Sequence, residues 1–253
     1  MPHAMETSRY PRARYVVESQ STEQQEETED EVEIFFVDLT TLPESQLTHL
    51  RQGGLVDGFR VCLLRDKHVR YLTKALEQPL NANYVSLDSS RPWMVYWTLH
   101  SLDLLDALPS CTTLERIVDT IRRCWCPKGG YGGGPQQLGH TAPTYAAVLA
   151  LTIVAGAQKC VDGPVPPRIR LAARDELSRV RPLLYKWFIS LRQPLGNLTG
   201  FCVNEDGEVD VRGTYTVISV CALLNLLTEE ILQGAVEYGK CLEFHSIVPS
   251  YLV

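Results

Sequence analysis

Three segments of this chain repeat one pattern, a tyrosine followed by an almost wholly apolar run of helical length. They span residues 96–105, 145–154 and 215–224, and their starts lie 49 and 70 residues apart. The longer gap contains a stretch rich in proline and arginine at residues 161–170, which is typical of an insertion. Without that stretch the period is about 50 residues, which indicates a helical repeat array.

Amphipathic segments lie between the apolar ones. Because a helix that is apolar on every side must be buried, and a striped helix can cover it from one side, we expect alternating inner and outer helices. Thr112 and Glu115 have the spacing of a capping box at the start of one outer helix. Strand signals are almost absent, so the sequence predicts an all-α fold. The apolar stripes are formed by Leu114, Ile117, Val118 and Ile121, and by Leu184, Trp187, Phe188 and Leu191.

The N-terminal region is strongly acidic. Residues 18–33 hold eight carboxylates and no lysine or arginine. Such a run repels itself and buries little apolar surface, so we expect residues 1–31 to be a disordered tail. An acidic arm that binds a basic partner is the alternative.

The rest of the chain is nearly neutral and has no long basic stripe, which argues against a nucleic-acid partner. No apolar run approaches the ~18 residues of a membrane span, and the first residues lack the apolar core of a secretory signal. We therefore expect a cytoplasmic protein whose eight cysteines are reduced.

Three motifs go beyond architecture. They are the sequences of residues 90–105, 126–148 and 207–215. The second contains a glycine-rich run followed by Ala-Pro-Thr-Tyr. Together they resemble the β-subunit family of protein farnesyltransferases, over roughly residues 62–241. The glycines at 129–134 lack the Gly-Lys-Ser/Thr of a phosphate-binding loop, so they are read as a turn between an outer and an inner helix.

The resemblance implies an α/α toroid of paired inner and outer helices around an aromatic-lined cavity. It also implies a heterodimer with an α subunit, which transfers a C15 isoprenoid from farnesyl diphosphate to the cysteine of a C-terminal CaaX motif. In such enzymes zinc holds the substrate cysteine as a thiolate, and magnesium assists the leaving diphosphate.

Four aromatic residues are candidates for the isoprenoid and peptide site. Trp93 and Trp97 are spaced i, i+4, so both rings lie on one helix face. Tyr145 and Tyr215 begin equivalent inner helices. The resemblance implies that all four line the cavity, with Tyr145 also helping to set the length of isoprenoid that fits. The alternatives are core tryptophans and repeat-defining tyrosines that satisfy helix ends.

Arg212 is the fifth candidate, three positions before Tyr215 at the start of an apolar helix. A guanidinium buried there needs a partner. Asp210 is the structural alternative for that partner. The resemblance instead implies a cation that faces the isoprenoid and the C-terminal end of the peptide.

The chain departs from the family in one respect. The family's zinc ligands are an Asp, a Cys and a His in later repeats, but no Asp-x-Cys pair occurs in the 253 residues. We therefore assign no metal ligand and no catalytic residue. We expect incomplete toroid repeats over 32–241, a tail unlike the family over 242–253, and no farnesyl transfer by the chain alone.

Two other functions remain as alternatives. A partial β chain that only binds the α subunit or a peptide fits the same residues. A terpene cyclase of the same architecture needs an Asp-x-Asp-Asp acid, which does not occur.

Overall fold

The computed structural model describes residues 20–33, 41–57, 60–196 and 198–239. The chain divides into two units, residues 64–242 and the remainder. None of the described helices combines the length and the hydrophobicity that a membrane crossing requires.

The smaller unit contains short elements. They are helices α1 (Gln20–Glu33) and α2 (Glu44–Gln52) and the hairpin of β1 (Val56–Asp57) and β2 (Arg60–Val61). Of the predicted disordered tail, residues 1–19 lie outside the described residues. Residues 20–33 form a helix instead, because glutamate and glutamine are good helix formers and i, i+4 bonds such as Gln25 Nε2 to Glu29 Oε1 (3.0 Å) add support.

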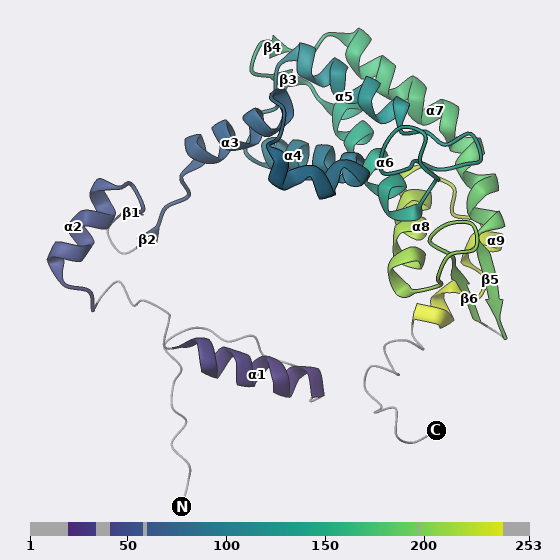
Figure 1. The fold of residues 1–253 in the computed structure, drawn as a ribbon, viewed down its shortest axis with the longest axis horizontal. Helices are drawn as coiled ribbons and strands as arrows, with labels where there is room; N and C mark the ends of the chain where they lie inside the picture. The colour runs from purple at the N-terminus through teal and green to yellow at the C-terminus, as the bar shows by residue number, and fades with distance from the viewer. Residues whose placement is uncertain (1–19, 34–40, 58–59, 197, 240–253) are drawn as a thin grey trace, which may run out of the picture. The chain divides into compact units, whose positions relative to one another are not determined.

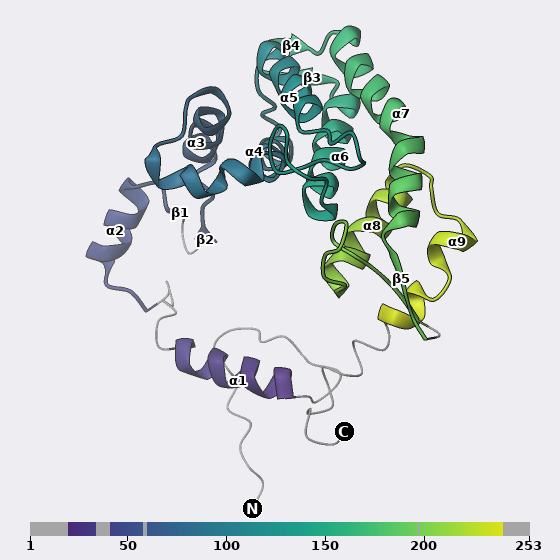
Figure 2. The ribbon, with the colours of Figure 1, turned by 45° about the vertical axis from the view of Figure 1, so that its right-hand side comes forward.

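The larger unit is a curved array of helices (Figures 1 and 2). In both views α4, α6 and α8 follow one another on its inner side, and α5 and α7 lie outside them. This is the predicted alternation of inner and outer helices in an all-α fold. Its helices are α3 (Arg65–Glu77), the 3-10 helix η1 (Ala82–Ser90), α4 (Arg91–Leu104), α5 (Cys111–Arg123), α6 (Thr141–Gly156), α7 (Pro167–Ser190), α8 (Val211–Leu223) and α9 (Glu229–Leu232).

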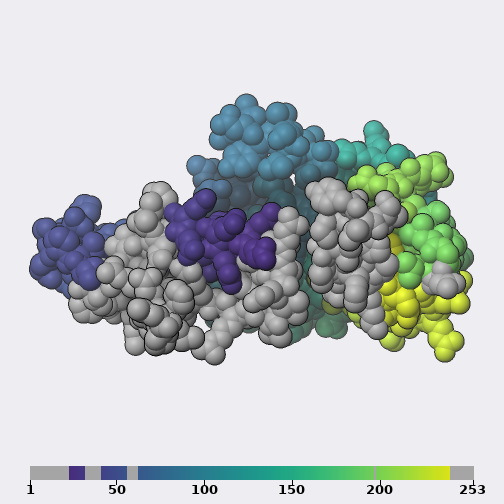
Figure 3. Space-filling view, turned by 90° about the horizontal axis from the view of Figure 1, so that it is seen from below, coloured from purple at the N-terminus to yellow at the C-terminus, as the bar shows by residue number. Residues whose placement is uncertain are grey.

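Two hairpins join these helices. β3 (Lys159–Cys160) pairs with β4 (Gly163–Pro164), and β5 (Arg192–Leu195) pairs with β6 (Leu198–Phe201), both antiparallel. The predicted insertion at residues 161–170 thus closes the first hairpin and begins α7. In the space-filling view the green to yellow atoms of the C-terminal part of this unit lie packed together (Figure 3). The backbone bond from Thr199 N to Gly234 O (3.0 Å) contributes to this packing.

Helix α6 is the centre of the core. It packs against α4, α5, α7 and α8, and the successive residues Ala146, Ala147 and Val148, which point to different sides of the helix, are all 0% exposed. This confirms the predicted burial for most of α6, while the side that carries Tyr145 and Leu149 is half-buried. The two predicted stripes on α5 and at the end of α7 are also buried. The predicted capping box of Thr112 and Glu115 is wrong, because α5 begins earlier than expected. Ser110 is its N-cap, and Ser110 Oγ accepts from Thr113 N (3.2 Å).

The glycine-rich run forms the turn between α5 and α6, as predicted. Gly129 and Gly130 adopt φ of 128° and 71°, which favour glycine. A Cβ added to Gly129 would lie 2.4 Å from Trp187, and one added to Gly130 equally close to the same ring. The absence of side chains therefore lets the turn lie directly on outer helix α7.

A buried carboxylate links this turn to the outer layer. Glu176 on α7 is 3% exposed and accepts hydrogen bonds from Tyr131 Oη (2.9 Å) and Arg179 Nη2 (2.6 Å). Arg122 Nε of α5 lies 3.4 Å from its other oxygen. Burial alone would raise the pKa of Glu176, but the hydrogen bonds from Arg179 and Tyr131 hold that pKa below its usual value.

We expect Glu176→Gln to lower the free energy of unfolding by about 1–3 kcal/mol near neutral pH, because it weakens the charged hydrogen bonds of a buried group. Urea denaturation followed by circular dichroism measures the loss. The lowered pKa means that ionised Glu176 stabilises the fold at neutral pH and that this contribution is lost in acid. The deficit of the variant should therefore shrink below the usual glutamate pKa of about 4.3.

Glu205→Gln is the matched control. Glu205 Oε2 pairs with Lys128 Nζ at 3.0 Å, but both side chains are mostly exposed. Such a pair contributes less than about 1 kcal/mol. Equal losses in the two variants would contradict the role given to Glu176.

Candidate functional site

An aromatic stripe runs along one face of α4. Trp93, Tyr96, Trp97 and His100 follow the i, i+3, i+4, i+7 spacing. The ring centroids of Trp93 and Trp97 are 5.2 Å apart, and Tyr96 stacks on His100 at 5.4 Å with an interplanar angle of 10°. Trp93 and Trp97 thus share a face, as their spacing predicts. Tyr96 and His100 were not among the predicted site residues, although their spacing from Trp93 identifies them.

The stripe continues onto the other two inner helices. Tyr145 of α6 lies 5.8 Å from Trp93 and 6.2 Å from Tyr96 between ring centroids. Tyr215 of α8 lies 6.0 Å from Tyr145. We call the connected rings of Trp97, Trp93, Tyr145 and Tyr215 the aromatic wall. The fold therefore joins four of the five predicted site residues, from three helices far apart in sequence.

The aromatic wall is accessible and uncharged. Trp97 is 51% exposed and Tyr215 is 62% exposed, while Trp93 and Tyr145 are half-buried. Partial burial and the neighbouring Tyr215 hydroxyl raise the pKa of Tyr145 to about 12. Tyr145 therefore keeps its proton at neutral pH, so it acts as a neutral contact surface rather than as a base. Such a surface suits a large apolar ligand.

Arg212 lies at the edge of the aromatic wall, in the first turn of α8. Its Nε donates to Asp210 Oδ2 (2.8 Å) and its Nη2 donates to Glu208 Oε1 (3.2 Å). The expectation of a buried guanidinium is wrong, because its side chain is 77% exposed. The predicted partner Asp210 is present. Nη1 of Arg212 makes no hydrogen bond with a described residue, so it can meet an anionic ligand.

His140 forms a second polar part of this edge. It is the N-cap of α6, and its Nδ1 accepts from Ala142 N (3.1 Å), which leaves Nε2 as the donor of the neutral ring. Burial lowers the pKa of His140, although Glu208 and Asp210 act in the opposite direction. His140 and Trp93 both line a cavity of about 640 Å³. The sequence alone does not identify His140 as a site residue, because its proximity to residues 208–212 depends on the fold.

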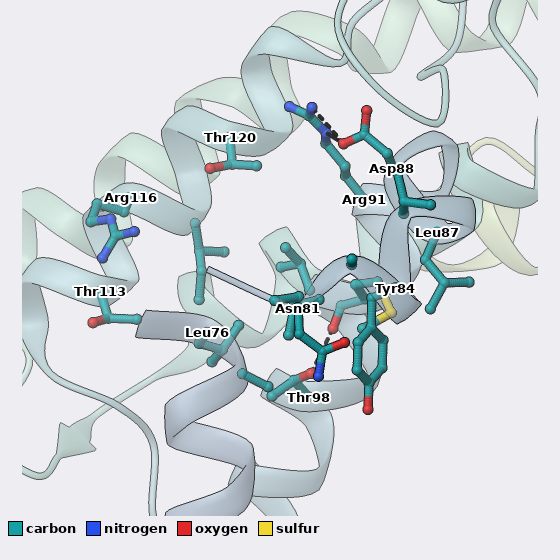
Figure 4. Close-up of a pocket in the computed structure, with 17 residues that line it drawn as sticks. Leu76, Asn81, Tyr84, Leu87, Asp88, Arg91, Thr98, Thr113, Arg116 and Thr120 are labelled. Carbon is teal, nitrogen blue, oxygen red and sulfur yellow. Dashed lines mark hydrogen bonds and ion pairs between the residues drawn. The ribbon is translucent and has the colours of Figure 1, made fainter. Parts of the chain in front are cut away.

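A second cavity of about 450 Å³ lies between α3, η1, α4 and α5 (Figure 4). Arg91 Nη2 pairs with Asp88 Oδ1 (2.7 Å) at one end of it, while Thr113 and Arg116 line the α5 side. None of the five predicted site residues lines this cavity. The aromatic wall and its polar edge therefore form the candidate site.

The comparisons with known proteins agree with this geometry. Residues 63–244 match the family model for the prenyltransferase alpha-alpha toroid domain. The chain is 38% identical over 174 residues to protein farnesyltransferase subunit beta of Arabidopsis thaliana and 39% identical over 179 residues to that of Saccharomyces cerevisiae. It is 29% identical over 185 residues to geranylgeranyl transferase type-2 subunit beta of Saccharomyces cerevisiae.

These matches cover most of this chain but less of each relative. They include 69%, 70% and 72% of the chain, and 32%, 38% and 50% of the three relatives in the same order. The chain thus spans a third to a half of the length of these curated relatives.

We expect His140 to make the stability of the chain depend on pH. A histidine with a lowered pKa stabilises the fold fully above its unfolded pKa of about 6.5, and this contribution is lost as the pH falls below that value. Burial disfavours the charged ring, and protonated Nδ1 can no longer accept the bond from Ala142. Between pH 7.5 and pH 5.5, His140→Asn should therefore lose less stability than the original chain. Asparagine keeps an N-cap acceptor that does not titrate.

Denaturant midpoints at the two pH values provide the measurement. His68→Asn, on an exposed position of α3, is the control and should keep the pH dependence of the original chain. If the denaturant midpoints of His140→Asn and His68→Asn change equally between the two pH values, protonation of His140 does not weaken the N-cap of α6.

Proposed function

The chain belongs to the prenyltransferase α/α-toroid family, and from this premise we propose that it acts as the β subunit of a protein farnesyltransferase. In this role the chain pairs with a helical α subunit in the cytoplasm and binds farnesyl diphosphate and CaaX substrates. The observation that carries the proposal is the aromatic wall, four connected rings from three inner helices. The identity of 38–39% to farnesyltransferase β subunits supports it.

The chemistry of the isoprenoid explains why such a wall is useful. A C15 chain offers no hydrogen-bonding group, so its site must be large, apolar and rigid. Trp93 and Tyr145 are held by contacts with each other and with Tyr96, so their rings are in position before a ligand binds. Because the hydroxyl of Tyr145 stays protonated, it places no charge beside the isoprenoid. In this proposal Tyr145 also limits how long an isoprenoid can be.

The polar edge fits the peptide substrate. A CaaX motif ends in a carboxylate, and Arg212 offers the unengaged Nη1 beside its bonds to Asp210 and Glu208. Asp210 in turn accepts from Gly213 N (2.8 Å), which fixes the carboxylate that orients the guanidinium. His140 Nε2 is a further donor on this edge. We propose that these groups bind the C-terminal end of the peptide while the aromatic wall contacts its apolar side chains.

The residues present do not fit the zinc ion that the family implies. The sequence has no Asp-x-Cys pair. Among the described residues, three candidate ligands come together only at Cys111, Cys160 and Asp162. Cys160 follows the C-terminal end of α6, whereas Tyr145 lies in the first turns of that helix. We therefore derive no step through zinc or magnesium, and we propose that this chain binds substrates without completing the transfer by itself.

We expect Tyr215→Ala to weaken farnesyl diphosphate binding by about tenfold, equivalent to about 1.4 kcal/mol. This is below the roughly 1.5–3 kcal/mol for burying a large side chain, since Tyr215 covers only the end of the wall. Binding is followed by the quenching of tryptophan fluorescence in the chain co-expressed with a farnesyltransferase α subunit. Tyr71→Ala on α3 is the control, since Tyr71 is 64% exposed but lies outside the aromatic wall.

A transfer assay on the same complex distinguishes a chain that only binds substrates from one that takes part in catalysis. It is supplied with Zn²⁺, Mg²⁺ and a CaaX peptide, and isoprenoid incorporation is measured. Binding without transfer supports a substrate-binding β chain that lacks its zinc ligands. Transfer would show that the complex holds a zinc site elsewhere and would overturn the ligand argument. If farnesyl diphosphate does not bind, or if Tyr71→Ala weakens binding as much as Tyr215→Ala, the proposed site is wrong.

A further inference from the structure

Two thiols and a carboxylate meet where the start of α5 approaches the β3–β4 hairpin. Cys111 Sγ and Cys160 Sγ are 3.4 Å apart. These two sulfur atoms and a carboxylate oxygen of Asp162 all lie within 4.8 Å of one another. Cys111 and Cys160 are 49 residues apart in sequence, so no local motif predicts the cluster.

Backbone hydrogen bonds hold the cluster together. Asp162 Oδ2 accepts from Cys111 N (2.8 Å), which ties the hairpin to the first residue of α5. Val161 N donates to Leu108 O (3.0 Å) in the segment before α5. Cys160 is paired with Gly163 in the hairpin itself. These bonds fix the backbone of both cysteines and the carboxylate of Asp162 without a ligand, which lowers the cost of ordering the three groups on binding.

We propose that Cys111, Cys160 and Asp162 bind a thiophilic divalent cation of the Zn²⁺ class. Two thiolates at about 2.3 Å from a tetrahedral Zn²⁺ stand about 3.8 Å apart, a few tenths of an ångström more than the present separation of the sulfur atoms. One thiol proton is released from each cysteine on binding, and no electron is transferred. The Asp162 oxygen completes three protein ligands, and water takes the fourth position.

The burial of the three groups fits an ion that enters from one side. Cys160 is 5% exposed, Cys111 is half-buried and Asp162 is exposed, so the sulfur atoms form the inner part of the site and the carboxylate its outer part. The bound cation would join α5 to the hairpin that follows α6. It would therefore stabilise the connection between an outer helix and the inner helix that it covers.

The carboxylate favours a cation over a disulfide. A disulfide between Cys111 and Cys160 would require the sulfur atoms to approach to about 2.05 Å and would make no use of Asp162. A cation uses all three groups, and the negative carboxylate attracts it. The disulfide is therefore the competing outcome of the experiment.

The test uses the complete chain without an affinity tag, reduced with a phosphine and titrated with Co²⁺ alone. We expect one equivalent to bind with a thiolate-to-cobalt charge-transfer band, which Zn²⁺ then abolishes. Cys111→Ser and Asp162→Asn should each weaken binding by more than about tenfold, the scale seen when metal sites lose supporting groups. Zn²⁺ should also raise the melting temperature of the original chain more than that of either variant.

Cys62→Ser is the matched control, because Cys62 is a half-buried cysteine outside the cluster. It should bind Co²⁺ as the original chain does. The proposal is overturned if the original chain gives no thiolate band or if the Asp162→Asn and Cys111→Ser variants bind like the control. It is also overturned if mass spectrometry finds a 111–160 disulfide in air and the reduced chain binds no Co²⁺. Asp162 is exposed, so Asp162→Asn keeps the test valid even where a cysteine variant fails to fold.

Discussion

The need to cover helix α6 on most of its sides organises the larger unit. This helix carries no charged residue, and Ala147, Leu151 and Val154 are fully buried because α4 and α8 flank it inside while α5 and α7 cover it outside. Its side that carries Tyr145 and Leu149 stays half-buried. Burial of that much apolar surface is the main favourable term in folding. The glycine turn before α6 approaches Trp187 closely for the same reason, since it must place α6 directly beneath α7. The position of Tyr145 in the wall is a consequence of this packing.

Much of this arrangement could be predicted from periodicity. The apolar runs at 145–154 and 215–224 and the stripe beginning at Leu114 give the inner and outer helices correctly, because burial depends on the pattern of each helix alone. Trp93 and Trp97 could be placed on one face for the same reason. The first residue of α5 was harder to predict, because the hydroxyls of Ser110 and Thr112 can both cap a helix. Ser110 is the actual cap, since the start of the helix depends on the preceding turn.

Contacts between distant segments could not be predicted. The approach of Cys111 to Cys160 and of His140 to Asp210 depends on how hairpins and turns return the chain, and no spacing in the sequence encodes it. Arg212 illustrates a different limit. Its position before an apolar helix suggested burial, but the first turn of α8 is open and the guanidinium remains in solvent while it pairs with Asp210. The family resemblance implied a site role for this residue without revealing its exposure.

The position of the wall residues within their helices has an electrostatic consequence. Trp93, Tyr145 and Tyr215 all lie in the first turns of α4, α6 and α8, and their rings are neighbours, so three helix N-termini gather at one rim. The peptide dipoles of the inner helices therefore point the same way, and their partial positive ends add at that rim. The outer helices return the chain in the opposite direction and offset the repulsion between parallel inner dipoles. The negative end of α6 then lies toward the β3–β4 hairpin, so the two rims of this helical array differ in polarity even where no charged side chain is present.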